Sequence, residues 1–299
     1  MKYRTLGSTG LRVSVIGVGT WQFGGEWGKN FEQGEVDGLL GRAKELGLNL
    51  IDTAECYGDH LSESLIGHAI RGQRNHWIVA TKFGHQFHAH MNRTEPRTPS
   101  DVQRQLEASL RALQTDVIDL YQYHSWGDEQ FDNEAVLDVL LQAKAAGKIR
   151  HIANSISKND KTHQVSHAPD HQVEAIQVIY NRIDTKPEAE VFPLCQKLNL
   201  GVLARVPLAS GFLTGKYPPG TRFTDPADVR SGQDPAVIEA KLRQVEHIQR
   251  TELPAGMALS QYALAWCLKH SAVTAVIPGC KDIAQLESNA AAANVDFVP

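Results

Sequence analysis

The sequence predicts an α/β protein folded as a single (β/α)8 barrel domain over residues 1–299, and three observations predict it. Eight short β-rich runs alternate with segments of helical periodicity. Most of these runs are nearly continuous in apolar residues, as is typical of parallel strands buried on both faces. A length of 299 residues suits one barrel, and no repeat, linker or low-complexity tract marks a second domain.

The elements can be assigned in chain order. Glycines at 47 and 147 follow two of the helical segments and are plausible C-caps. The expected strands are 15–19, 49–54, 77–83, 117–124, 149–155, 175–181, 201–207 and 273–279. The expected helices are 36–46, 61–70, 100–113, 135–146, 188–198, 236–250, 260–270 and 283–293.

Two segments are additions to the barrel. Residues 2–14 predict a hairpin that closes the barrel bottom, and the long connection after residue 207 contains an extra helix, an insertion between strands seven and eight. The competing architecture is a doubly wound open sheet. That fold usually carries a glycine-rich dinucleotide fingerprint after its first strand, and here Gly17-Val18-Gly19 lacks the third glycine.

Composition excludes several classes of protein. Lys plus Arg is 30 and Asp plus Glu is 34, so the net charge of −4 argues against a nucleic-acid partner. No apolar run approaches the roughly 20 residues that span a bilayer, so we expect no membrane association. The four cysteines are scattered and the N-terminus lacks a signal-peptide pattern, which predicts free thiols and a cytoplasmic protein.

In a (β/α)8 barrel the functional residues lie at the carboxyl ends of the strands. Asp52, Lys82 and His124 each end an apolar run, and Tyr57 follows the second strand closely. A lysine beside a phenol lowers the pKa of the tyrosine, and an aspartate keeps the lysine charged. Tyr57 could then act as a general acid toward a carbonyl group. The structural alternative is a buried Asp52–Lys82 ion pair that only stabilises the barrel rim.

Several further motifs occur in order along the chain: 51–58 (IDTAECYG), 80–83 (ATKF), 119–124 (DLYQYH), 147–150 (GKIR), 177–181, 207–217 (PLASGFLTGKY) and 277–279 (IPG). With these motifs, the sequence strongly resembles the aldo-keto reductases from Leu6 to Asn289. The resemblance implies hydride transfer between NADP(H) and an aldehyde or ketone, reversible in the direction of alcohol oxidation. It places the family's catalytic tetrad on Asp52, Tyr57, Lys82 and His124, with Tyr57 as proton donor.

The same resemblance implies a cofactor site. Lys281 precedes the last expected helix, where it could bind the 2′-phosphate of NADP(H). Gln285 and Asn289 lie one helical turn apart and could contact the adenine. The implied cofactor residues are Gly19, Thr20, Trp21 and Asp52 beside the nicotinamide, Asn154, Ser155 and Gln177 at its carboxamide, Arg205, Pro207, Leu208, Ser210, Gly211, Leu213, Lys216 and Arg222 along the phosphates, and Gly279, Lys281, Gln285 and Asn289 at the adenosine.

Two segments depart from the family's usual pattern. Members often place an aromatic residue and a serine where this chain has Arg205-Val206, so Arg205 would have to replace aromatic stacking on the nicotinamide. The fifth-strand motif, commonly Gly-Val-Ser-Asn, reads Ala153-Asn154-Ser155-Ile156, which removes one polar contact.

The substrate is a small carbonyl or alcohol compound in this interpretation, contacted by Trp21, Tyr57, His124 and Trp126. Phe23, Trp27, Phe87 and Phe131 are further aromatic candidates for the barrel mouth. His85, His88 and His90 follow the third strand, but a polar loop is favoured there over a metal site, and no metal is expected. The expected assembly is a monomer or a weak homo-oligomer. The alternatives are a cofactor-binding regulatory subunit on the same barrel and a barrel lyase or isomerase.

Overall fold

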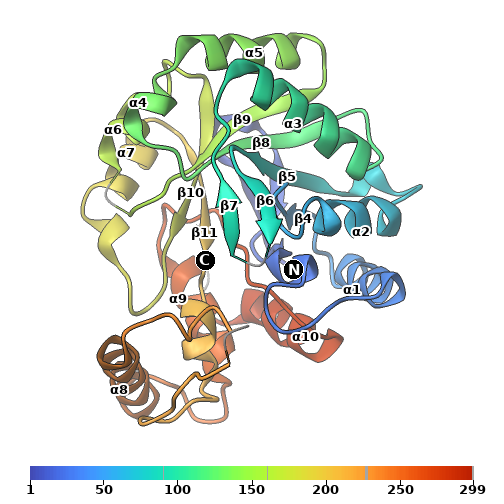
Figure 1. Ribbon diagram of the computed structural model, residues 1–299. Coiled ribbons are helices and arrows are strands. Elements are labelled where there is room, and N and C mark those ends of the chain that lie inside the picture. Colours follow the sequence, from blue (N-terminus) through green and yellow to red (C-terminus); the bar gives the residue numbers. More distant parts are fainter. Residues whose placement is uncertain (90, 160, 226–227, 298–299) are drawn as a thin grey trace.

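The computed structural model describes residues 1–89, 91–159, 161–225 and 228–297, and it confirms the predicted barrel (Figure 1). Eight parallel strands pair in the order β3, β4, β5, β8, β9, β10, β11, β12. Their bounds are β3 (Val18–Gly19), β4 (Leu50–Asp52), β5 (Ile78–Phe83), β8 (Ile118–His124), β9 (Ile149–Ser155), β10 (Val173–Ile179), β11 (Gly201–Arg205) and β12 (Ala275–Val276).

Backbone hydrogen bonds between the first and last strands close the sheet into a barrel. The amide of Gly17 donates to the carbonyl of Val276 (2.8 Å), and the amide of Val276 donates to the carbonyl of Val15 (2.9 Å). Parallel bridges also join Ile16 to Val276 and Gly19 to Gly279. Closure leaves neither end strand as a free edge, and it brings residues 17–20 beside residues 276–279.

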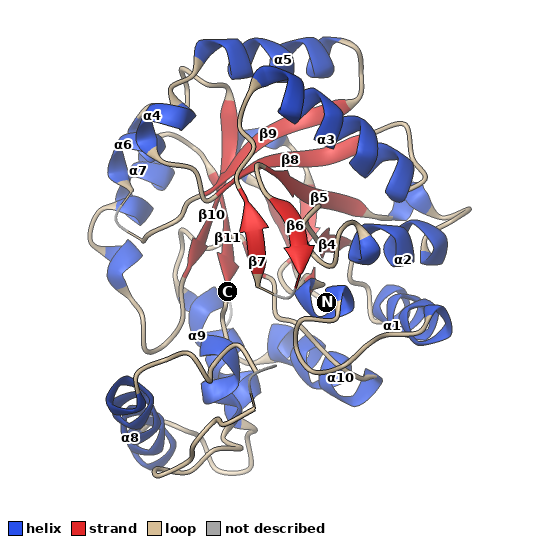
Figure 2. Ribbon diagram, in the orientation of Figure 1, coloured by secondary structure: helices blue, strands red, loops and turns tan. Residues whose placement is uncertain are grey.

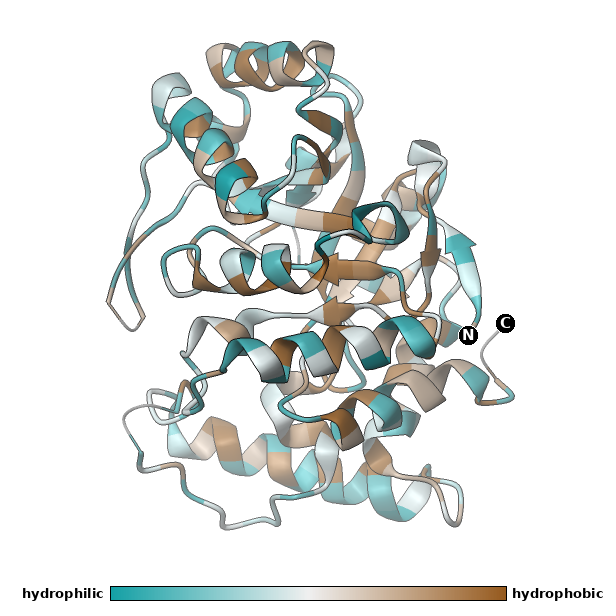
Figure 3. Ribbon diagram, turned by 90° about the vertical axis from the view of Figure 1, so that its right-hand side faces the viewer, coloured by the Kyte–Doolittle hydropathy of each residue, from teal (hydrophilic) through white to brown (hydrophobic). Residues whose placement is uncertain are grey.

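Helices surround the strands, as Figure 2 shows. They carry both apolar and polar stretches, whereas the strands inside are mostly apolar (Figure 3). Gly47 and Gly147 follow α1 and α5 with φ of +82° and +74°, as left-handed C-caps do. The helices are α1 (Gln33–Glu45), α2 (Leu61–Ala69), α3 (Pro99–Ala112), α4 (Asp128–Phe131), α5 (Glu134–Ala145), α6 (Thr162–Ser166), α7 (Val191–Lys197), α8 (Pro235–Thr251), α9 (Leu259–Lys269) and α10 (Ile283–Ala291).

The predicted N-terminal hairpin pairs β1 (Tyr3–Thr5) with β2 (Arg12–Ser14), and it closes the bottom of the barrel. Leu6 and Val13 are fully buried in one apolar cluster with the barrel-facing residues Leu50, Ala80, Leu120 and others of the strands. The turn of this hairpin packs tightly against the barrel at Gly7. The φ of Gly7 is +52°, and an added Cβ there would lie 2.1 Å from the amide nitrogen of Gly201. The open end of the barrel is therefore the opposite one, at the carboxyl ends of the strands.

Two segments that follow strands of the barrel contribute to that open end: the insertion after β11 and a hairpin after β5. The insertion between β11 and β12 includes the predicted extra helix, α8, which packs with α9 in a separate apolar cluster. The antiparallel hairpin of β6 (Gln86–Ala89) and β7 (Asn92–Thr94) was not predicted from the sequence. No helix in the described part of the chain is long and apolar enough to cross a membrane.

Candidate active site

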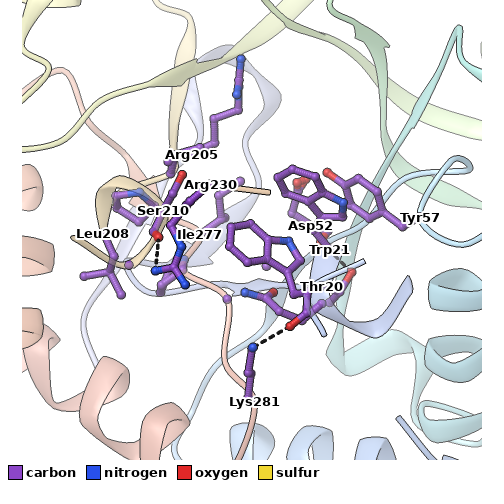
Figure 4. A pocket seen from close by; sticks show the side chains of 18 of the residues that line it. Thr20, Trp21, Asp52, Tyr57, Arg205, Leu208, Ser210, Arg230, Ile277 and Lys281 are labelled. Atoms are coloured by element: carbon purple, nitrogen blue, oxygen red, sulfur yellow. Dashed lines mark hydrogen bonds between the residues drawn. The ribbon is translucent and has the colours of Figure 1, made fainter. Parts of the chain in front are cut away.

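A cavity of about 470 Å³ opens at the carboxyl ends of the strands, where the sequence predicts the site (Figure 4). Asp52 ends β4, His124 ends β8 and Arg205 ends β11, so the barrel itself brings these side chains to one opening. The cavity continues from this inner end to the loop after β11 and to the segment before α10. Its volume is typical of a pocket for a cofactor or another small molecule.

Asp52, Lys82 and Tyr57 form a hydrogen-bonded chain at the inner end. Lys82 Nζ lies 2.7 and 2.9 Å from the two carboxylate oxygens of Asp52 and donates to the hydroxyl of Tyr57 at 3.1 Å. It also donates to the backbone carbonyl of Thr53 at 2.7 Å, so all three ammonium donors have partners. Asp52 and Lys82 are 3% and 1% exposed, so they form an ion pair away from solvent. Asp52 holds the charged amino group of Lys82 against the phenol of Tyr57.

Burial and charge act in opposite directions on these groups. Burial alone would lower the pKa of Lys82, but Asp52 and Tyr57 beside it raise that pKa above the ordinary lysine value. Burial raises the pKa of Tyr57 to about 12, and the Lys82 ammonium offsets only part of this rise. The lysine therefore lowers the phenol pKa, as the sequence argument expects, but burial outweighs it. Tyr57 is protonated at neutral pH, which is the state that a proton donor requires.

Gln177 connects Asp52 to the neighbouring strands. Its Nε2 donates to both Asp52 oxygens at 3.0 Å, and its Oε1 accepts from the hydroxyl of Ser155 at 3.3 Å. Gln177 lies on β10 and Ser155 on β9, and both are buried. Because each polar atom has a partner from another strand, the carboxylate of Asp52 is held in one orientation.

His124 lies beside Tyr57 in an enclosed environment. The two rings are 6.3 Å apart between centroids and nearly perpendicular. Burial, with His85 and Lys82 nearby, lowers the pKa of His124 well below its ordinary value. The imidazole is therefore neutral near pH 7, so it can donate or accept a hydrogen bond without adding charge to the cavity.

One wall of the inner cavity, the tryptophan wall, consists of Trp21 and Trp27, and the buried carboxylate of Glu26 holds it by a hydrogen bond. The Trp21 ring stacks near Tyr57 at 6.0 Å and meets Trp27 edge-on at 5.1 Å. Trp21 Nε1 donates to Glu26 Oε2 at 2.8 Å, and Glu26 also pairs with Arg93 of the β6–β7 hairpin. The unpredicted hairpin is thus tied to the tryptophan wall, and it adds side chains of Met91 and Arg93 to the cavity.

The outer part of the cavity follows an unusual backbone after β11. Val206, Ala209 and Ser210 have φ of +54°, +49° and +57°, followed by Gly211 at +89°. A positive φ is especially costly for a β-branched residue such as Val206. Strain of this kind is often found at ligand sites, where the surrounding structure holds it in place. The turn lines the cavity with Pro207, Leu208 and their neighbours.

Basic side chains gather at the outer end. Lys281 Nζ donates to the backbone carbonyl of Trp27 at 2.7 Å, and Lys29 Nζ donates to the carbonyl of Lys281 at 2.9 Å. Arg230 makes a two-pronged contact with Asp228 at 2.9 and 2.6 Å and reaches the carbonyl of Ser210 at 3.4 Å. Figure 4 shows Arg230 and Lys281 on the far side of the cavity from Tyr57. Cations here suit an anionic ligand.

The structure brings most of the residues named from the sequence together and leaves some outside the lining. Asn154 is buried behind it and donates to Gln164, while Trp126 is fully buried against Phe83 and Tyr123. Asn289 donates to the carbonyl of Gly279 at 3.3 Å and so supports the cavity edge from behind. The lining includes Gly19, Thr20, Trp21, Asp52, Tyr57, His124, Gln177, Arg205, Pro207, Leu208, Ser210, Gly211, Lys216, Gly279, Lys281 and Gln285, but not Lys82, Trp126, Asn154, Ser155, Leu213, Arg222 or Asn289.

Other lining residues were missed by the sequence analysis. Arg230 belongs to an irregular stretch of the insertion, and Arg93 belongs to the unpredicted hairpin. Neither follows a strand end or a motif, so no local signal marks them. The buried Glu26 that organises the tryptophan wall carries no sequence signal either.

Comparison with known proteins agrees with this geometry. A (β/α)8 barrel with polar residues gathered at its open end is the arrangement that the sequence resemblance predicts for an oxidoreductase of the aldo-keto reductase class. The chain belongs to the Aldo/keto reductase family, whose sequence model matches residues 15–299.

Relatives match over nearly the whole chain. "Aldo-keto reductase YhdN" of Bacillus subtilis is 32% identical over 306 residues, covering 96% of this chain and 87% of that protein. The "NADH-specific methylglyoxal reductase" of Escherichia coli is 28% identical over 314 residues, covering 99% and 95%. In structure, the chain resembles the holo form of aldo-keto reductase AKR11C1 from Bacillus halodurans, with a TM-score of 0.82 and 27% identity over 99% of this chain and 91% of that one. It also resembles glycerol dehydrogenase AKR11B4 from Gluconobacter oxydans, with a TM-score of 0.80 and 27% identity over 94% and 86%.

Proposed function

We propose that this protein reduces an aldehyde or ketone with NADPH, reversibly, and that Tyr57 gives the proton to the carbonyl oxygen. The observation that carries the proposal is the Asp52–Lys82–Tyr57 chain at the inner end of the cavity. It holds a protonated phenol next to a permanent positive charge. As the phenol loses its proton to the substrate, that charge stabilises the phenolate that forms.

The residues of the cavity fit a nicotinamide dinucleotide. Such a ligand is elongated and carries its anionic groups away from the reacting ring, and here Arg230 and Lys281 lie across the cavity from Tyr57. Arg205 Nε is buried without a hydrogen-bond partner among the described residues, so a ligand acceptor would relieve a real cost. When bound, the cofactor supplies or accepts the hydride.

The chain's own groups then have separate roles. Tyr57 donates the proton, Lys82 holds the phenol hydroxyl by its hydrogen bond, and Asp52 anchors Lys82. The neutral His124 directs the carbonyl oxygen toward Tyr57. The tryptophan wall of Trp21 and Trp27 excludes water and favours substrates with an apolar or aromatic part.

The preference for NADPH over NADH is the finer part of the proposal. It is supported by Lys281 and Arg230, two cations at the outer end that suit the extra phosphate. The relative named as NADH-specific shows why the preference needs its own measurement. We further propose that the whole chain acts as one barrel domain, cytoplasmic and monomeric or weakly self-associating.

The direct test is oxidation of NADPH and of NADH with 4-nitrobenzaldehyde, comparing wild type with Tyr57→Phe. Loss of the hydroxyl removes the proton donor, so we expect turnover to fall by about 10²–10⁴-fold. Tyr123→Phe is the matched control, because it removes a buried hydroxyl one residue before His124 that has no partner in the described chain.

The outcomes separate the candidate functions. Turnover that collapses only in the Tyr57 variant, with NADPH preferred, would support the proposal. Tight cofactor binding without turnover of any carbonyl would favour the regulatory subunit instead. No cofactor binding at all would point to a barrel lyase or isomerase.

A further inference from the structure

Next to Tyr57, four side chains with metal-ligating atoms converge. Glu55 and Cys56 come from the turn after β4, His85 follows β5, and His124 ends β8. One ligand atom from each lies within 4.8 Å of each of the others. This set differs from the three histidines that follow the third predicted strand, His85, His88 and His90, because it shares only His85 with them. His88 contacts Thr94 at 2.8 Å instead, and His90 lies outside the described residues.

Glu55 carries the second observation. Its Oε1 accepts a hydrogen bond from the backbone amide of His85 at 2.8 Å, which fixes the carboxyl group. Its Oε2 is buried without a hydrogen-bond partner in the described chain, and the residue is only 3% exposed. His85 Nδ1 is likewise buried and unpartnered there. An unsatisfied buried carboxyl oxygen is costly, and a cation would satisfy it.

Two of the six separations between these ligand atoms are close to those around a small tetrahedral ion, and all six are within 4.8 Å. Cys56 Sγ lies 3.8 Å from His124 Nδ1, and that nitrogen lies 3.9 Å from Glu55 Oε2. Zinc–ligand bonds of about 2.0–2.3 Å at tetrahedral angles place neighbouring ligand atoms roughly 3.3–3.6 Å apart. Shifts of a few tenths of an ångström would bring these two separations, Cys56 to His124 and His124 to Glu55, to the values around a zinc ion. His85 Nε2 also lies 3.6 Å from Glu95 Oε1, where a carboxylate could orient a ligating imidazole from behind.

We propose that Glu55, Cys56, His85 and His124 form a binding site for Zn²⁺. A set of one sulfur, two imidazole nitrogens and one carboxylate oxygen matches the borderline softness of this ion. On binding, the Cys56 thiol releases its proton to solvent, and the resulting thiolate and the Glu55 carboxylate balance the two charges of the ion.

The surrounding charges limit the affinity and make it selective. Arg93 donates to the backbone carbonyl of Cys56 at 3.4 Å, and Lys82 lies beside Tyr57, so both cations are near the site and oppose the binding of another cation. A cation without affinity for thiolate, such as Mg²⁺, gains too little here to bind.

The consequence for activity rests on the proposed function. Cys56, His85 and His124 all line the cavity beside Tyr57. An ion held by them engages the imidazole that would direct the substrate carbonyl and occupies space at the inner end. Zinc binding should therefore inhibit reduction reversibly.

The binding test uses Co²⁺ as a spectroscopic substitute for zinc and does not depend on turnover. We expect one equivalent to bind wild type, with a thiolate-to-cobalt charge-transfer band and the visible bands of tetrahedral cobalt, and zinc to displace it. Cys56→Ser should lose the charge-transfer band, and Glu55→Gln should bind on the order of 10- to 100-fold more weakly. His88→Ala is the matched control from the adjacent hairpin and should behave as wild type.

Several outcomes would overturn the site. No cobalt band in wild type would do so, and so would an unchanged band in Cys56→Ser, since one of the buried cysteines Cys195, Cys267 or Cys280 would then be the ligand. The test uses two variants, Cys56→Ser and Glu55→Gln, so that the site can still be tested if one of them fails to fold.

Inhibition is measured separately, as the rate with zinc relative to each variant's own zinc-free rate. Zinc should lower the rate of wild type at least tenfold, and EDTA should restore it. The rate of Cys56→Ser should change much less when zinc is added. Cobalt binding in a protein that reduces no carbonyl would leave the metal site standing and remove the proposed function.

Discussion

The two ends of the cavity are built in different ways. At the inner end, Asp52, Lys82 and Gln177 are nearly fully buried and satisfy one another from three different strands. At the outer end, Lys281 and Arg230 come from loops and are paired with a backbone carbonyl and a neighbouring carboxylate. The inner end is fixed by its own contacts, which suits the proton transfer that we propose for Tyr57. The outer end holds cations on partners that an anionic ligand can replace, which suits binding and release.

The difference follows from what positions the side chains. Strand register places Asp52 opposite Ala80 and Lys82 opposite Gln122, so the inner groups cannot shift without breaking the barrel. The outer groups depend on loops: Arg230 contacts the turn at 206–211, which has several residues of positive φ, and Lys281 is held by the carbonyl of Trp27. Substitutions at the inner end should therefore cost both rate and stability, and those at the outer end should cost mainly affinity.

The largest effect is expected for Lys82→Met. The substitution leaves the Asp52 carboxylate buried without its cation and should destabilise the fold by about 3–5 kcal/mol. Turnover should fall at least as far as in Tyr57→Phe, because the phenol loses the charge that stabilises it. Urea unfolding and steady-state rates measure both, with the exposed Lys44→Met as control. A variant as stable as wild type would show that the inner end is not held by this ion pair.

A smaller effect, confined to binding, is expected for Arg230→Met. If Arg230 contacts a cofactor phosphate, the KM for NADPH should rise by about tenfold or more, since a hydrogen bond to a charged group contributes roughly 1.5–3 kcal/mol. The kcat should change little. Arg222→Met is the matched control, because Arg222 belongs to the same insertion but does not line the cavity. Equal effects of the two substitutions would mean that only the general charge of the insertion matters.

The smallest effect concerns how the insertion is attached to the barrel. Arg182 donates to both oxygens of Glu252 at 2.9 and 2.6 Å, and Tyr262 donates to the same carboxylate at 2.8 Å. The hydrogen bonds from Arg182, followed by that from Tyr262, lower the pKa of Glu252 below its ordinary value. The stability it contributes is therefore present above the ordinary carboxyl pKa and is lost as the pH falls through the lowered value.

Glu252→Gln should then cost about 1 kcal/mol at pH 7 and progressively less in acid, because the contact is partly exposed to solvent. Unfolding by urea at pH 7 and near pH 3 tests the sign. Glu246→Gln, at an exposed position on the same helix, should change stability by less than about 0.5 kcal/mol at either pH. A cost that grows in acid would contradict the assignment.

Much of the barrel could be predicted because its signals are local. The run Ile118–His124 is mostly apolar or aromatic, with Asp119 and Gln122 inside it, and the structure makes it β8 with all but His124 buried. The hairpin of β6 and β7 gave no such signal. Its residues are mostly polar and exposed, and its position depends on the contact of Arg93 with Glu26, far away in the chain.

For the site, the sequence by itself determined the inner end. Asp52, Lys82 and His124 lie at the ends of mostly apolar runs whose length predicts buried strands, and parallel strands in a barrel bring such ends to one opening. The tertiary structure alone decided the outer end and the balance of charge. Arg230 reaches the cavity through an irregular insertion, and Trp126 turns into the core rather than toward the opening. The pKa of Tyr57 is raised although a lysine lies beside it, because the cost of burying a charge depends on everything packed around it, which no local pattern records.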